Sequence, residues 1–447
     1  MISLSDNSKM DLRSDDEANA LSHYAGKGLK KLAEENPGLL VFPDCLGKYG
    51  DNWGEDECLY RLREKCLHAG NVVGFFGVND VHVQIRSRFD KDENNQYFFH
   101  YMLCRVFGIN MLNLPTKTDK ESIWDFLPFL FPYFLKRAVA QGIFRTYRTV
   151  CRNDDRVRGA IDVSRHIRDN IPFNGRVAYR TREYTPNNFL ISLVRHTIEV
   201  IRRNSEFKGI LNNDGDTRDA VAKIMEFTPD YNRNDLSKVI ARNLRPVRHP
   251  FYTEYTALQK LCLQILRHEK MTFGADKDKV NGIVFKAEWL WEEYLAMVLP
   301  AAFVHPQKKD KRSHLDFYTG RDNLRYKGAI PDFYNETLLV IDAKYKPLEE
   351  RLRKDALRED RFQLISYMHI LKSAIGLLLF PIKPGKDQLQ WEGELCGYGG
   401  WVGIYGIKIP QNSDNFKTFS DKMKKEEENL VKRLDGSSQD FIRKNIS

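Results

Sequence analysis

The residues best suited to chemistry lie in one segment, residues 330–346, which reads IPDFYNETLLVIDAKYK. Its run Leu338–Ile341 consists of strand-forming residues, and Asn335–Glu336 is a turn signal between this strand and the one before it. Side chains alternate along a strand, so Asp342 and Lys344 are expected on one face. A carboxylate and an ammonium group are thereby directed at one point.

A second carboxylate, that of Asp332, lies ten residues before Asp342. A hairpin would bring the two together, and neighbouring carboxylates repel each other unless a cation lies between them. Hard oxygen ligands favour Mg²⁺ or Mn²⁺, which would neutralise charge on a phosphodiester and activate water, while Lys344 orients that water. We therefore predict a metal site for phosphodiester hydrolysis, with Asp342 as an exposed carboxylate. The alternative is an exposed strand end that carries a surface ion pair.

Two flanking helices contribute three further candidates. In FKAEWLWEEYLAMVLP, residues 285–300, Glu292 lies immediately beside the apolar stripe of the expected helix. It is a candidate third carboxylate, and a solvated helix face is the alternative. In the helix expected over 357–372, Gln363 and Tyr367 are four residues apart and share a face. Both could hydrogen-bond a phosphate or a metal-bound water, or they could pack in the core.

The elements around these residues predict the fold class. From residue 285 onward the pattern is a helix, three strands, a helix, two strands and a charged helix, which is typical of an α/β domain with a central mixed sheet. Alternation over 72–89 predicts a hairpin with one buried face. The predicted organisation is multi-domain α+β, with a disordered tail over 1–20, an N-terminal mixed α/β region over 21–120, a mostly helical middle domain over 121–253 and the α/β domain over 254–447.

Composition limits the class of protein. Lys and Arg outnumber Asp and Glu by 70 to 61, a net charge of +9 that favours polyanionic partners such as nucleic acid. Seven scattered cysteines without a C-x-x-C pair argue for a reducing compartment, and we expect a cytoplasmic protein. The most apolar segment, residues 123–135, is too short to cross a membrane and contains two prolines. No P-loop motif occurs, so the chain is not expected to hydrolyse nucleotides itself.

The order of the candidate residues resembles that of the PD-(D/E)xK nuclease superfamily. The matching pieces are the helix with Glu292, then Pro331–Asp332, then Asp342-Ala-Lys344 with Asp in place of the commoner Glu, and then Gln363-x-x-x-Tyr367. The resemblance implies a restriction-endonuclease-like fold over 254–447. It also implies that Glu292, Asp332 and Asp342 bind Mg²⁺, that Lys344 assists water attack, and that Gln363 and Tyr367 support them.

From about Val72 onward the chain is similar to McrC-type nuclease subunits of McrBC modification-dependent restriction systems. The resemblance rests on VVGFFGVNDVHVQIRSRF, FFHYMLCRVFGI, GIFRTYRTV, VRGAIDVSRHI, REYTPNNFLISLVRHTI, LWEEYL, IPDF, VIDAKYK and FQLISY. It implies double-stranded DNA carrying 5-methylcytosine as substrate. It also implies a McrB-like AAA+ GTPase that binds the GTP and contacts region 21–120, with Val72–Phe89 as the candidate contact. The alternatives are an autonomous or differently partnered nuclease and a non-catalytic DNA-binding assembly subunit.

Overall fold

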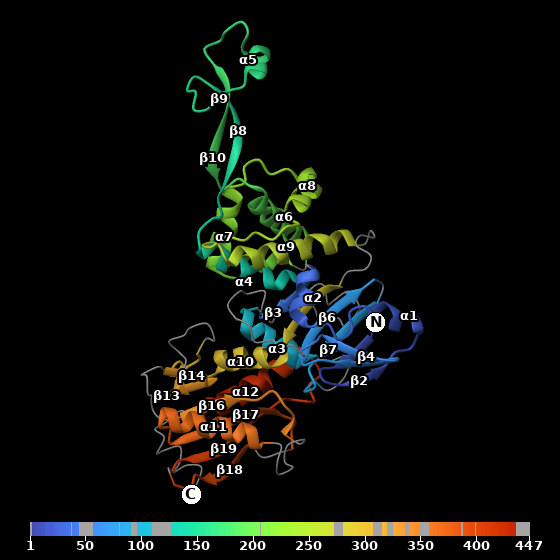
Figure 1. The fold of residues 1–447 in the computed structure, drawn as a ribbon, viewed down its shortest axis with the longest axis vertical. Coiled ribbons are helices and arrows are strands. Elements are labelled where there is room, and N and C mark those ends of the chain that lie inside the picture. The colour runs from blue at the N-terminus through green and yellow to red at the C-terminus, as the bar shows by residue number, and fades with distance from the viewer. Residues whose placement is uncertain are drawn as a thin grey trace. The chain divides into compact units, whose positions relative to one another are not determined.

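The structure is a computed structural model that describes residues 2–36, 38–43, 57–79, 81–90, 96–109, 127–205, 207–271, 280–306, 315–319, 325–335, 339–348, 357–385, 388–397 and 399–434. The chain divides into two compact units (Figure 1). Unit 1 comprises Met1–Ile123 and Ala275–Ser447, and unit 2 comprises Trp124–Gly274. Unit 2 is therefore inserted between two segments of unit 1. The domains predicted from the sequence instead follow one another along the chain.

The N-terminal part of unit 1 is built on a sheet with strand order β1-β7-β6-β11-β3. The predicted hairpin is confirmed, because β6 and β7 pair antiparallel around Asn79, whose φ is 52°. Every residue of β6 is buried, so the hairpin is covered on both faces and the expectation of one buried face is wrong. The strands are β1 (Ile2–Ser5), β3 (Leu39–Phe42), β6 (Val72–Val78), β7 (Val81–Arg86) and β11 (Val280–Lys286).

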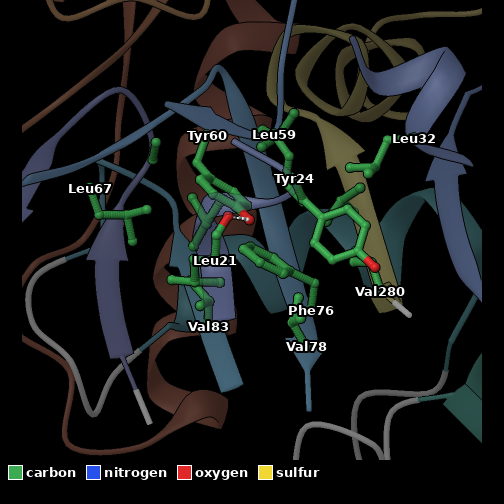
Figure 2. Close-up of a cluster of buried hydrophobic side chains, with 14 of the residues drawn as sticks. Leu21, Tyr24, Leu32, Leu59, Tyr60, Leu67, Phe76, Val78, Val83 and Val280 are labelled. Carbon is green, nitrogen blue, oxygen red and sulfur yellow. Dashed lines mark hydrogen bonds between the residues drawn. The ribbon is translucent and has the colours of Figure 1, made fainter. Parts of the chain in front are cut away.

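Figure 2 shows the cluster that covers one face of this sheet. The Tyr60 ring stacks on Phe76 with ring centroids 5.3 Å apart, and its hydroxyl donates to the Leu21 carbonyl oxygen at 2.7 Å. Aromatic rings from two helices, α3 (Tyr97–Phe107) and α10 (Ala287–Val298), lie against Phe42 and Phe285 of the sheet. This double cover is the reason that β6 carries apolar residues without alternation.

The N-terminal tail predicted as disordered is instead ordered structure. Strand β1 pairs parallel with β7, and Ile2 and Leu4 enter the core cluster, while β2 (Lys9–Asp11) pairs with β5 (Cys66–Ala69). The polar composition of residues 1–20 favours disorder. A local sequence pattern does not reveal pairing with strands that lie far along the chain. The remaining elements of this part are α1 (Asp15–Ser22), α2 (Leu29–Glu35) and β4 (Tyr60–Arg63).

A buried carboxyl group lies where the chain enters α3. Asp90 accepts a hydrogen bond from the Phe98 backbone N–H at 2.8 Å, and burial raises the pKa of Asp90 to about 8. The folded protein therefore keeps a proton on Asp90 that the unfolded chain releases above its ordinary pKa of 3.8. The resulting cost in stability is absent near pH 4 and grows as pH rises toward 8.

We expect Asp90→Asn, which keeps the acceptor oxygen but cannot ionise, to be more stable than the native protein at pH 8. The gain should be several degrees in melting temperature, since 1 kcal/mol moves it by about 2–4 °C in a domain of this size. Calorimetry at pH 8 and at pH 5 checks the sign, because the gain must shrink at the lower pH. A gain that is equal at both values would contradict the proposed ionisation.

The C-terminal part of unit 1 contains the predicted mixed sheet. Its strand order is β12-β15-β16-β17-β19-β18, in which β16, β17 and β19 run parallel and the outer neighbours β15 and β18 run antiparallel to them. Helix α11 (Arg358–Leu371) connects β16 to β17, and α12 (Phe416–Leu434) follows β19. The strands are β12 (Phe303–Val304), β15 (Phe333–Asn335), β16 (Leu339–Ala343), β17 (Ile375–Ile382), β18 (Leu389–Glu394) and β19 (Trp401–Lys408), and β13 (Leu315–Thr319) with β14 (Arg325–Ala329) forms a separate ribbon.

Several strands and helices predicted from the sequence can be compared with the mixed sheet and its neighbours. The strands near 374–380 and 400–409 and the charged C-terminal helix are confirmed. Strand β18 is not among the expected strands, since its sequence LQWEGE has only a weak apolar pattern, and it is held by antiparallel pairing with β19. Glu336 of the expected turn and residue 338, the first of the expected strand, lie outside the described residues.

Unit 2 contains the predicted helices and a ribbon that was not predicted. The described helices are α4 (Leu127–Ala140), α6 (Phe189–Arg203), α7 (Gly215–Glu226), α8 (Leu236–Arg242) and α9 (Glu254–Met271), with short 3-10 turns at Lys208–Asn212 and Arg233–Asp235. The antiparallel strands β8 (Thr146–Asp154) and β10 (Val177–Thr185) extend from these helices to β9 (Ala160–Ile161) and α5 (Val163–Asn170) (Figure 1).

The expected domain boundary at residue 253 is wrong. Helix α9 packs against α4 and α6 of unit 2, burying Leu258 and Leu261, and Arg137 of α4 forms a bidentate ion pair with Glu254. A sequence pattern shows that α9 has an apolar face but does not show which partner covers it. The apolar segment near residues 123–135 becomes buried α4 over its described part, as expected. Among the described residues no helix is long and apolar enough to cross a membrane.

Candidate active site at the end of strand β16

The end of β16 brings together a carboxylate and an ammonium group. Asp342 lies in β16, opposite Leu378 of β17, and the Lys344 backbone N–H donates to the Leu379 carbonyl oxygen at 2.9 Å. Pairing with β17 thus continues one residue past the strand and keeps its alternation. Lys344 Nζ lies 2.7 Å from Asp342 Oδ2, so the prediction that the two side chains share a face is confirmed.

The antiparallel pair β15–β16 carries Asp332 to the same place. Phe333 is opposite Ile341, so Asp332 lies beside the end of β16, where its Oδ2 accepts a hydrogen bond from the Ala343 N–H at 2.7 Å. The Asp332 charge is one of the causes that raise the pKa of Asp342. The predicted approach of Asp332 to Asp342 is therefore confirmed.

Asp342 is not the exposed carboxylate that we expected from the sequence. Its residue is 1% exposed because β16 is an inner strand of the sheet. Burial, followed by the charge of Asp332, raises the pKa of Asp342 to about 8, against the opposing effect of Lys344. Burial lowers the pKa of Lys344, but the nearby carboxylates, Asp342 first, raise it by more, so the lysine stays protonated at neutral pH.

Helix α11 supplies the next partners of the lysine. Lys344 Nζ donates to Gln363 Oε1 at 3.0 Å, and Gln363 Nε2 donates to the Tyr367 hydroxyl at 2.7 Å. Gln363 therefore contacts the lysine directly, and Tyr367 contacts Gln363. Gln363 is exposed whereas Tyr367 is buried, so the site reaches the protein surface along this helix.

Sequence reasoning missed Asp360, a buried carboxylate one turn before Gln363 in α11. Its Oδ1 lies 3.7 Å from Lys344 Nζ and 3.8 Å from Lys346 Nζ. The i, i+3 spacing to Gln363 was a usable signal, because residues at that spacing lie on neighbouring parts of one helix face. The charge of Asp360 is one of the causes that raise the pKa of Lys344, after Asp342 and Asp332.

Glu292 is not grouped with the two aspartates. It is half-buried on α10, and its charge helps to raise the pKa of His305, although burial of the ring opposes that rise. His305, also missed by sequence reasoning, donates from Nδ1 to the Asp332 carbonyl oxygen at 2.8 Å and lies 3.8 Å from Glu293. In the described parts of the chain, no three His, Cys, Asp or Glu side chains have the geometry of a metal site.

The two aspartates nevertheless suit a small hard cation. Asp342 Oδ2 is a buried oxygen that accepts no hydrogen bond of ordinary geometry from the described residues, and Lys344 provides only an ion-pair contact. Two adjacent carboxyl groups are the donors that Mg²⁺ prefers, and this ion usually keeps several waters as further ligands. Asp332 and Asp342 are therefore sufficient protein ligands for such an ion together with a phosphate.

Comparisons with known proteins found a matching family model and similar solved structures. A family model described as McrBC 5-methylcytosine restriction system component matches residues 67–381, more than half of the chain. A refined half-complex from a tetradecameric assembly of Thermococcus gammatolerans McrB AAA+ hexamers with bound McrC is 17% identical, covers 95% of this chain and 99% of its own, and has a TM-score of 0.48.

A cryo-EM structure of the Thermococcus gammatolerans McrBC complex is 18% identical, covers 66% of this chain and 86% of its own, and has a TM-score of 0.33. No curated protein matches the sequence. The family match includes β6, β7, unit 2 and the Asp332, Asp342, Lys344 and Tyr367 positions. The chain therefore belongs to the family of McrBC 5-methylcytosine restriction system components.

Proposed function

We propose that this chain is the Mg²⁺-dependent DNA endonuclease subunit of its restriction system, with a PD-(D/E)xK type of active site. The observation that carries the proposal is the meeting of Asp332, Asp342 and Lys344 at the end of β16. Membership in the family of McrBC 5-methylcytosine restriction system components supports the proposal. Two adjacent carboxyl groups, which a bound cation would keep ionised, beside a protonated lysine are suited to phosphodiester hydrolysis.

In this proposal Asp332 and Asp342 would hold Mg²⁺, for which Mn²⁺ could substitute, and Glu292 of α10 remains the candidate third ligand. When bound, such an ion would neutralise charge on the phosphate and lower the pKa of a water ligand. Lys344, held by Asp342 and Gln363, orients the attacking water and stabilises the developing negative charge. Tyr367 fixes the Gln363 amide, which limits where the ammonium group can move.

The proposed partners are double-stranded DNA that carries 5-methylcytosine and a McrB-like AAA+ GTPase, which binds the GTP. In this proposal the McrB-like GTPase contacts region 21–120 of the chain. Strand β6 is buried throughout, so within the described part of Val72–Phe89 the contact would involve the exposed residues Asn79 and His82, with exposed residues around the hairpin. Without a P-loop motif, this chain has no evident nucleotide site of its own.

The test is cleavage of methylated and unmethylated plasmid by the purified chain in Mg²⁺, with and without GTP and a McrB-type GTPase from the same organism. We expect cutting of the methylated plasmid when both partner and GTP are present. Cutting by the chain alone would keep the nuclease site and replace the motor-dependent function with an autonomous one. Absence of cutting in every mixture, with assembly of the complex intact, would contradict the nuclease assignment.

A further inference from the structure

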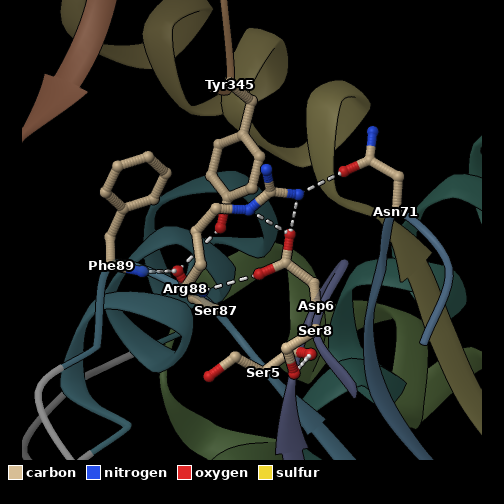
Figure 3. A network of polar contacts seen from close by, with 8 residues as sticks. All are labelled: Ser5, Asp6, Ser8, Asn71, Ser87, Arg88, Phe89 and Tyr345. Carbon is tan, nitrogen blue, oxygen red and sulfur yellow. Dashed lines mark hydrogen bonds and ion pairs between the residues drawn. The ribbon is translucent and has the colours of Figure 1, made fainter. Parts of the chain in front are cut away.

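Tyr345, the residue after Lys344, ties the active-site strand end to the N-terminal sheet. It is 1% exposed, and its hydroxyl lies 2.7 Å from Ser87 Oγ, just past the end of β7. Its ring makes an edge contact with Phe89, with ring centroids 5.1 Å apart, and lies under the Arg88 guanidinium at 5.5 Å. Three consecutive residues of the N-terminal part therefore surround one aromatic side chain (Figure 3).

Arg88 is itself fixed from two directions. Its Nε donates to Asp6 Oδ2 at 2.7 Å, its backbone N–H donates to Asp6 Oδ1 at 2.6 Å, and its terminal nitrogen donates to Asn71 Oδ1 at 2.9 Å. Asp6 follows β1 directly and is 2% exposed, so both partners of this ion pair are held by the backbone of the N-terminal sheet (Figure 3). A buried, multiply bonded pair of this kind has one well-defined geometry.

These contacts lie beside a cavity of about 270 Å³ between the two parts of unit 1. The cavity is lined by Asp6, Arg88 and Phe89 from the N-terminal part, and by Leu348, Ile382 and Lys383 from the C-terminal part. Beside this cavity the contacts to Tyr345 connect the two parts, together with the bond from Gln411 Nε2 to the Phe89 carbonyl oxygen at 2.9 Å. The position of Tyr345 is therefore set by the N-terminal sheet as well as by its own.

We propose that Tyr345 is a positioning residue for Lys344, and that Ser87, Arg88 and Asp6 of the N-terminal part hold it in register. The inference rests on the proposed nuclease function. Lys344 and Tyr345 are adjacent and their side chains have separate partners, so a shift of the tyrosine moves the backbone from which the lysine reaches Asp342 and Gln363. Displacement of a reacting group by about 1 Å can cost about 10²-fold in rate.

The test compares Tyr345→Phe and Ser87→Ala, which remove the same hydrogen bond from its two sides, with the double variant; Ser87→Ala also removes the acceptor of the Phe89 N–H at 3.1 Å. Tyr101→Phe is the matched control, because Tyr101 is also fully buried and donates its hydroxyl at 2.8 Å, to Glu427 away from the site. We expect each of the first two variants to lower kcat about tenfold with an unchanged KM for DNA, and the double variant to lose no more than one single variant. Tyr101→Phe should retain kcat.

A second measurement does not depend on cleavage. The rate at which a succinimidyl ester acylates the Lys344 amine, followed by mass spectrometry of the full chain, should rise in Tyr345→Phe and Ser87→Ala and stay constant in Tyr101→Phe. If the native chain cuts no DNA under any condition, the proposed function fails while this measurement still tests the positioning. Unchanged acylation and unchanged kcat in folded Ser87→Ala and Tyr345→Phe would overturn the inference, as would equal losses in Tyr101→Phe.

Discussion

Replacement of Asp342 by asparagine is expected to reduce DNA cleavage at least about 10³-fold, since a metal-bound charge contributes several kcal/mol and each 1.36 kcal/mol is tenfold in rate. The amide keeps the size of the side chain and removes one of the two carboxylates at the end of β16. The buried position of Asp342 makes this variant preferable to alanine, which would leave a cavity beside Lys344.

The same substitution should change thermal stability little. Burial raises the pKa of Asp342 to about 8, so the native carboxylate is costly in the folded state and an amide avoids that cost, while Lys344 keeps Asp360 at 3.7 Å. Plasmid cleavage with partner and GTP, together with a thermal melt, measures both effects. Asp360→Asn is the matched control, because it also removes a buried carboxylate near Lys344 but leaves Asp332 and Asp342 intact. Its loss of cleavage should be much smaller. Cleavage retained in Asp342→Asn would refute the site.

Replacement of Lys344 by methionine is expected to lower kcat by about 10²–10³-fold, the usual effect of removing a group that stabilises charge or moves a proton in the transition state. Affinity for Mn²⁺ should be kept, because the aspartates remain and a competing positive charge 2.7 Å from Asp342 is removed. A loss of turnover without a loss of metal binding distinguishes a lysine that activates water from a lysine that only forms a structural ion pair.

Calorimetric titration with Mn²⁺ and single-turnover cleavage measure the two quantities on the same sample. Lys346→Met provides the comparison, since Lys346 is two residues away and its ion pair, 3.8 Å from Asp360, does not include Asp342. We expect that variant to cut DNA at nearly the native rate. Loss of Mn²⁺ binding in Lys344→Met would mean that the lysine organises the metal site and does not act on the water.

The local parts of the candidate site could be predicted from the sequence because they depend on short-range periodicity. Alternation along β16 was enough to place Asp342 and Lys344 on one face, and the four-residue spacing in α11 was enough to pair Gln363 with Tyr367. The approach of Asp332 also followed, since an antiparallel neighbour ten residues away needs only a short turn. The same periodicity identified α10 and the β6–β7 hairpin.

Properties that depend on distant segments could not be predicted. The burial of Asp342 comes from its inner position in the mixed sheet, and Asp360 joins the site only when α11 packs on that sheet. The ordered N-terminus has the same cause, because β1 gains its partner from β7, about eighty residues later in the sequence.

By itself, then, the sequence determined the residue types of the site, their order and the faces on which they lie, since these follow from the geometry of single strands and helices. Only the tertiary structure decided how much water reaches Asp342, whether Glu292 joins the aspartates, and that Tyr345 bonds to Ser87, 258 positions away. The physical reason is that burial and electrostatics are sums over neighbours in space, and those neighbours are chosen by packing of whole sheets and helices.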